Sequence, residues 1–139
     1  MQGGGFNSTS NTAGTMVTAN GVMIVNGPNS TGAVSTVGSL TLTGGASIAI
    51  SPITTGRYFG ISLFQDRSST NQVTLTGNSS WNLTGTVYAR SAFADVTGGA
   101  NSTMGSQFIV DSIRLTGNTT FNNINPGLGY RPRDIRLVE

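Results

Sequence analysis

The chain has 139 residues, enough for one domain or one compact repeat array, and 36% of them are hydrophobic while only 9% are charged. It contains no cysteine and no histidine, which excludes disulfide bonds, thiolate or imidazole metal ligands and an imidazole general base. The net charge is +2 and all seven basic residues are arginines spread along the chain, so we expect no nucleic-acid partner.

The N-terminal segment, residues 1–20, is rich in Gly, Ser, Thr and Asn and has no charged side chain. Its composition predicts a flexible arm. It lacks the basic stretch followed by an apolar stretch that marks a signal peptide. No part of the chain reaches the roughly 18 consecutive apolar residues that a membrane-spanning helix needs, so we expect no membrane span.

Residues 21–125 repeat one pattern four times. Each copy has a short apolar run opened by glycine, a connection of variable length, and then two apolar runs joined by Thr-Gly and small residues. This second part reads LTLTGGASIAI at 40–50, VTLTGNSSWNL at 73–83 and IRLTGNTTFNN at 113–123, with a degraded copy from Val96. The opening glycines are Gly21, Gly60, Gly85 and Gly105. Constant strand modules with variable connections are typical of a stacked repeat.

The apolar runs alternate with polar residues at a period of two. Val73 and Leu75 alternate with Thr74 and Thr76, as in a strand with one buried face. No window of ten residues has an apolar stripe at helical spacing, so we expect an all-β fold. The residues expected to form ladders in the core are Leu42, Ile48, Leu75, Trp81, Leu83, Leu115 and Phe121.

Glycine and asparagine follow the apolar runs at the points where the chain must turn. Both residue types adopt positive φ at little cost, so they are expected to form the corners between strands. The expected corner residues are Gly44, Gly77, Asn78, Gly98, Gly117 and Asn118.

The repeat predicts a small right-handed parallel β-helix, a β-solenoid of about four to five rungs with three short strands in each. Each strand would pair in parallel with its counterpart about 4.8 Å away, which would place Ile48, Trp81 and Phe121 near one inner ladder. Thr41, Thr74 and Arg114 would share an outer ladder. The alternative is a jelly-roll or Greek-key β-sandwich, which also has many short strands and Gly/Asn turns.

A polar loop begins at Asp66-Arg67, directly after the apolar run ISLF. The structural interpretation is a turn closed by the Asp66 side chain, and the functional one is a loop that contributes Asp66 and Arg67 to a ligand site. The loop lacks the alternating Asp and Gly of a calcium-binding repeat, so neither a metal nor any other cofactor is expected. A polysaccharide-cleaving enzyme would require Asp66, Asp95 and Asp111 to cluster.

The C-terminal segment, residues 126–139, ends in YRPRDIRLVE. Its arginines would suit an anionic surface. However, Pro132 followed by IRLV favours an edge strand or cap that covers the last rung, because the ends of a solenoid are otherwise open sheet edges.

Three stretches of the repeat, GRYFGISLFQDRSSTN (56–71), LTGNSSWNLTGTVYA (75–89) and GSQFIVDSIRLTGN (105–118), resemble the C-terminal β-helix region of Tad-type pilus-assembly (TadE/TadG-like) bacterial envelope proteins. The resemblance covers roughly residues 20–125 and implies an exported bacterial protein at the cell surface or outside the cell. It brings no catalytic residue. The membrane-anchoring N-terminal segment of that family has no counterpart here.

These observations favour a non-enzymatic extracellular structural protein. Its open solenoid ends and N-terminal arm would let it associate end to end with itself as a surface or fibre subunit. The alternative is an adhesin-like module that binds carbohydrate or another envelope protein through its polar face or loops.

Overall fold

The computed structural model describes residues 2–9, 16–44, 47–77, 81–99 and 102–117. These residues form an all-β fold without an α-helix, and they include no helix long and apolar enough to cross a membrane. The strands are β1 (Gly4–Ser8), β2 (Met16–Ala19), β3 (Ile24–Asn26), β4 (Val37–Gly44), β5 (Ser47–Ile50), β6 (Ile61–Gln65), β7 (Val73–Gly77), β8 (Trp81–Gly98) and β9 (Ser102–Gly117), with a 3-10 turn at Val34–Thr36.

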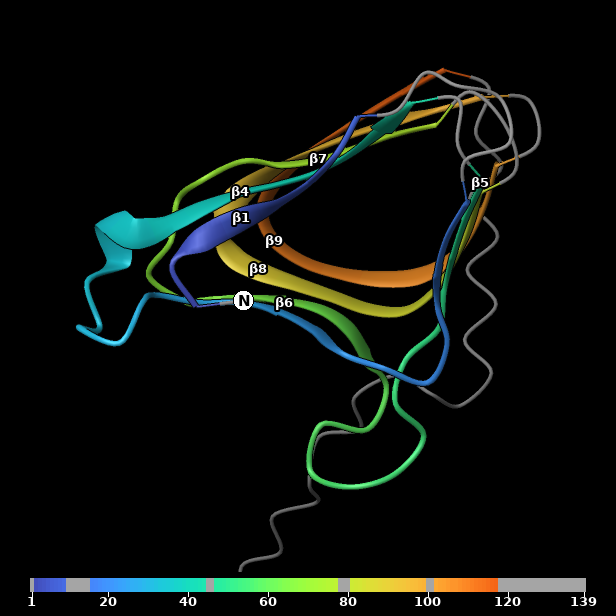
Figure 1. The fold of residues 1–139 in the computed structure, drawn as a ribbon. Coiled ribbons are helices and arrows are strands. Elements are labelled where there is room, and N and C mark those ends of the chain that lie inside the picture. Colours follow the sequence, from blue (N-terminus) through green and yellow to red (C-terminus); the bar gives the residue numbers. More distant parts are fainter. Residues whose placement is uncertain (1, 10–15, 45–46, 78–80, 100–101, 118–139) are drawn as a thin grey trace, which may run out of the picture.

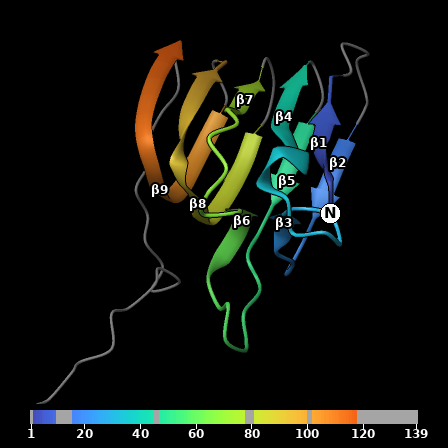
Figure 2. The same ribbon diagram turned by 90° about the vertical axis from the view of Figure 1, so that its left-hand side faces the viewer.

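The nine strands form one parallel sheet that curls around a buried core in a half-barrel (Figure 1). Strands β1, β4 and β7 follow one another across the sheet, as do β2 and β5, and β3 and β6. The long strands β8 and β9 bend and continue all three series (Figure 2). Every pair among the described strands is parallel, which is incompatible with the antiparallel jelly-roll or Greek-key alternative.

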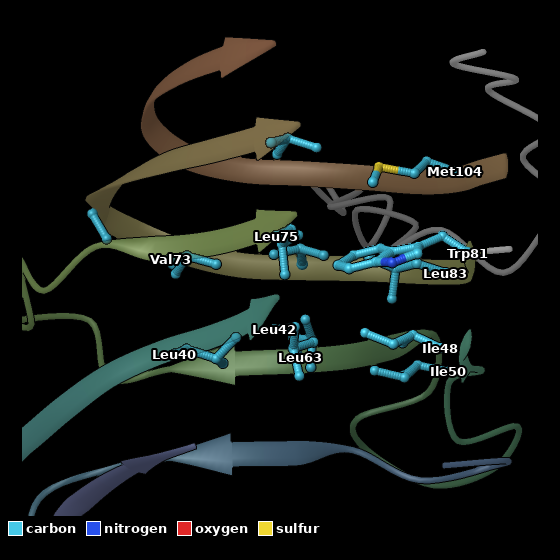
Figure 3. Close-up of a cluster of buried hydrophobic side chains, with 14 residues drawn as sticks. Leu40, Leu42, Ile48, Ile50, Leu63, Val73, Leu75, Trp81, Leu83 and Met104 are labelled. Atoms are coloured by element: carbon cyan, nitrogen blue, oxygen red, sulfur yellow. The ribbon is translucent and has the colours of Figure 1, made fainter. Parts of the chain in front are cut away.

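Like residues meet in register across the sheet. Leu42 pairs with Leu75, and Ile48 pairs with Trp81. Figure 3 shows these side chains arranged in successive levels, with Leu83 on the level of Trp81 and Met104 on the next. All of them are buried, because the alternation of apolar and polar residues directs every second side chain to the concave side.

The outward side chains also form a ladder. Thr41 pairs with Thr74, Thr74 with Asp95 and Asp95 with Arg114, so the outer ladder expected for Thr41, Thr74 and Arg114 is confirmed and includes Asp95. Parallel pairing of like positions therefore organises both surfaces of the sheet.

The expected flexible arm, residues 1–20, requires a correction. Its described parts include β1 and β2, which pair with β4 and β5. A Cβ atom on Gly5 would lie 2.2 Å from the carbonyl oxygen of Ser39, and one on Gly38 would lie 2.5 Å from the Gly5 nitrogen. Here glycine allows two backbones to approach closely. The glycine-rich composition therefore reflects close packing of β1 on β4.

The corner glycines stand in register at the strand ends. Gly44 pairs with Gly77, and Gly98 pairs with Gly117. Gly117 has the expected positive φ, 88°, but Gly77 does not. The prediction that Gly77 is needed for a positive φ is therefore wrong. A Cβ atom on Gly77 would lie 2.0 Å from Nε1 of Trp81, so Gly77 is required for space. The predictions for Asn78, Asn118, Phe121 and residues 126–139 concern positions outside the described residues.

Leu115 was expected in the buried core, but it is partly exposed. It pairs with Val96, as the ladder requires, but its side chain is 50% exposed. The physical reason is its position on β9, which pairs only with β8 within the described part of the chain. A side chain on the last strand of a stack has a neighbour on one side only.

Candidate functional site

Within the described residues, the strands at the two ends of the stack pair on one side only. At one end, β1 pairs only with β4 and β2 only with β5; at the other, β9 pairs only with β8, among the described strands. Apolar side chains are exposed at both ends: Met16 on β2, and Ile113 and Leu115 on β9. Exposed strand edges with apolar residues are sites where another chain can add a strand.

The two residues of the Asp66-Arg67 loop have different roles: Asp66 holds the turn, and Arg67 lies on the surface. Oδ1 of Asp66 accepts a hydrogen bond from the Ser68 backbone N–H at 2.9 Å, and the Asp66 carbonyl accepts one from the Ser69 N–H at 3.1 Å. The Asp66 side chain therefore closes the turn. Arg67 turns toward β8, where its guanidinium lies 5.8 Å from the ring centroid of Tyr88.

Arg67 is one wall of a surface groove of about 470 Å³, which we call the arginine groove. Phe64 on β6 and Tyr88 on β8 are register partners at its base, and their rings stack with centroids 5.2 Å apart and planes 5° from parallel. The 51–60 loop supplies Arg57, Tyr58 and Phe59. Of these lining residues the sequence analysis identified only Arg67. The available signal was an aromatic residue shortly after each opening glycine, Phe64 four residues after Gly60 and Tyr88 three residues after Gly85, and a register shift between β6 and β8 brings the two into register.

A buried cluster of amide side chains that was not predicted from the sequence lies at the ends of β3 and β6. The Nδ2 atom of Asn26 donates to the Gly38 carbonyl at 2.8 Å and to Oε1 of Gln65 at 3.3 Å. Gln65 donates in turn to the carbonyl of Asn71 at 2.6 Å, and the Asn71 side chain donates to the Val37 carbonyl. Asn26 and Gln65 are fully buried. The Asn26 side chain joins β3 directly to β4, and Gln65 joins β6 to β4 through Asn71, which gives the cluster a structural role.

An ion pair crosses the outer ladder between β8 and β9. Arg114 donates from Nε to Oδ1 of Asp95 at 3.0 Å and from a second guanidinium nitrogen to Oδ2. The hydrogen bonds and charge of Arg114 hold the pKa of Asp95 below its usual value, even though partial desolvation opposes this effect. Asp95 likewise raises the pKa of Arg114, which stays protonated across the working pH range.

The lowered pKa of Asp95 predicts an acid-dependent loss of stability. The pair contributes while Asp95 is ionised, above the ordinary carboxyl pKa of 3.8, and its contribution is lost as the pH falls through the lower pKa of the folded state. We expect Asp95→Asn to flatten the acid limb slightly and to lower stability near pH 7 by the same small amount, because Arg114 is well exposed. Urea unfolding between pH 2.5 and 7 measures both. An identical acid limb in the variant would contradict the assignment.

The three acidic side chains considered for catalysis are each engaged separately. Asp66 closes its turn, Asp95 pairs with Arg114, and Asp111 accepts a hydrogen bond from Ser112 at 3.3 Å. No three Asp, Glu, His or Cys side chains of the described residues lie close enough together to hold a metal ion.

Comparison with known proteins adds no relative to this description. No protein-family model, curated protein or solved structure matches the chain.

Proposed function

We propose that this chain is a small parallel β-helix that assembles head to tail as a non-enzymatic structural subunit of a fibre or cell surface. The observation that carries the proposal is that, within the described part of the chain, both ends of the stack are parallel strands that pair on one side only. A head-to-tail contact of this kind does not close on itself and therefore extends into a filament.

The ladders of side chains on the concave surface indicate the register in which β9 of one copy would pair with β1 of the next. Two of them run from β1 to β9: Phe6–Leu40–Val73–Ala94–Ile113 and Ser8–Leu42–Leu75–Val96–Leu115. If β9 of one copy pairs with β1 of the next in the same register, Ile113 meets Phe6 and Leu115 meets Ser8. Ile113 and Leu115, 41% and 50% exposed in the single chain, would then be covered like the residues below them.

Charge does not oppose this contact. The described part of β1, Gly4–Ser8, has no charged side chain, and Arg114 on β9 is already paired with Asp95. Because β1 is uncharged, the junction would not bring like charges together.

An engineered disulfide tests the proposed register. The chain has no cysteine, so a variant with Ser8→Cys and Leu115→Cys has only these two thiols. Directly paired residues on parallel strands have Cα atoms about 4.8 Å apart, within the range of a disulfide. We expect oxidation to give a series of covalent multimers on a non-reducing gel.

The matched control is Asn7→Cys with Leu115→Cys. Asn7 neighbours Ser8 but pairs with Thr41 on the outward ladder, so its Cβ points away from the concave side. It should therefore form few multimers. Equal cross-linking of both variants, or only monomers from both, would contradict the proposed junction.

The proposed location at the cell surface depends on the resemblance of residues 20–125 to Tad-type envelope proteins. The alternative function, a module that binds carbohydrate or an envelope protein, has a separate supporting observation in the arginine groove.

A further inference from the structure

We propose that the arginine groove binds an acidic polysaccharide, a chain of sugar units bearing carboxylates. This inference gives a ligand class and a site to the binding-module alternative, and it does not depend on head-to-tail assembly. The groove combines three properties that such a ligand requires: a rigid apolar base, exposed aromatic side chains, and guanidinium groups without a carboxylate partner among the described residues.

The base of the groove is held by the sheet. Phe64 and Tyr88 stack because they are register partners on neighbouring parallel strands. The adjoining 51–60 loop is held by its own backbone hydrogen bonds, from the Gly60 N–H to the Ile53 carbonyl at 3.0 Å and from the Ile61 N–H to the Tyr58 carbonyl at 3.1 Å. A site with fixed walls loses less entropy when a ligand binds.

The aromatic side chains of the loop are exposed to solvent. Tyr58 is 48% exposed and Phe59 is 36% exposed. One face of a pyranose ring carries mainly C–H groups, and covering a ring face with it removes apolar surface from water. Tyr58 lines the groove, and its hydroxyl can exchange hydrogen bonds with sugar hydroxyls.

The positive charges of the groove favour a ligand that carries carboxylates. Arg57 and Arg67 line it, and none of the described lining residues is acidic. The nearest carboxylate in the sequence, Asp66, is bound to the Ser68 N–H. The ion pair of the described residues is made by Arg114, so the guanidiniums of Arg57 and Arg67 have no carboxylate partner there. A planar guanidinium binds a carboxylate through two parallel hydrogen bonds.

A single-stranded nucleic acid fits the groove less well. Phe64 and Tyr88 cover one another's faces, so a base cannot insert between them. Nucleic-acid binding is dominated by many phosphate contacts, whereas the groove offers two guanidiniums.

The test compares polygalacturonate fragments with the same fragments after methyl esterification, which removes the charge and keeps the sugar chain. Titration is followed by tyrosine and tryptophan fluorescence or calorimetry, at protein concentrations where the chain is monomeric. We expect the acidic fragments to bind at least about tenfold more tightly than the esters. Arg57→Gln with Arg67→Gln should abolish this preference and leave ester binding unchanged, whereas Tyr58→Ala should weaken both.

The control is Arg90→Gln, which removes an exposed arginine of β8 that does not line the groove. It should bind like the wild type, and unfolding curves should confirm that all variants are folded. The proposal is overturned by equal binding of acid and ester, by no binding of either at millimolar concentration, by an equal loss in Arg90→Gln, or by tighter binding of an oligothymidylate.

Discussion

Replacing Trp81 by alanine is expected to lower the free energy of unfolding by about 3–5 kcal/mol. Trp81 is the largest of the fully buried side chains and lies between the levels of Ile48 and Met104 (Figure 3). Its removal leaves a cavity that the neighbouring strands cannot fill, because their positions are fixed by parallel pairing on both sides. Trp81 is the only tryptophan, so denaturant unfolding should be followed by circular dichroism.

Gly77 provides the control for this prediction. Alanine at this position would place a Cβ atom 2.0 Å from Nε1 of Trp81, and overpacking of a core typically costs about 1–3 kcal/mol. In the Trp81→Ala background this clash is absent, so Gly77→Ala should cost much less there. Additive effects of the two substitutions would contradict the contact, because a direct clash must appear as coupling in a double-mutant cycle.

Replacing Leu115 by arginine is expected to raise the concentration needed for assembly by about 100-fold or more. Leu115 continues the Leu42–Leu75–Val96 ladder, so a second copy stacked in register would bury the new charge in an apolar interior. Burying an unpaired charge costs several kcal/mol, and about 1.4 kcal/mol corresponds to each tenfold change in affinity. Sedimentation velocity and negative-stain microscopy over a concentration series measure the effect.

The matched variant is Thr116→Arg, which adds the same charge to the next residue of β9. Thr116 bonds to Thr97 on the outward face, so its substitution should affect assembly only slightly. A strictly monomeric wild type at all concentrations would overturn the proposed assembly. Equal inhibition by both arginines would show that net charge, and not the position in the ladder, controls association.

The sequence was sufficient to predict the all-β fold, and the predicted outer ladder of Thr41, Thr74 and Arg114 is confirmed. The repeated Thr-Gly phrase carried this information, because residues at equal positions in each copy pair across the sheet. The closed rungs of a β-helix stay a prediction, as does the function.

Other features depend on contacts that no single segment encodes. The glycines of β1 suggested a flexible segment in the sequence. They are needed because the β1 backbone closely approaches Gly38, which lies more than 30 residues away along the chain. The exposure of Leu115 depends on which strand ends the stack, while the same Thr-Gly-Asn follows both Leu115 and the buried Leu75. The arginine groove joins β6, β8 and the 51–60 loop, and only the register of Phe64 and Tyr88 brings these together.

The amide cluster of Asn26, Gln65 and Asn71 has a consequence for the accuracy of folding. If β3 slid by two residues along β6, apolar side chains would still face the interior, so hydrophobic burial alone discriminates weakly against such a misaligned state. The slip would, however, separate Asn26 from Gln65 and from the Gly38 carbonyl and leave buried amides without partners. The cluster therefore specifies the alignment of β3 with β6, because its buried hydrogen bonds form only in the native register. A uniformly apolar interior would not give this specificity.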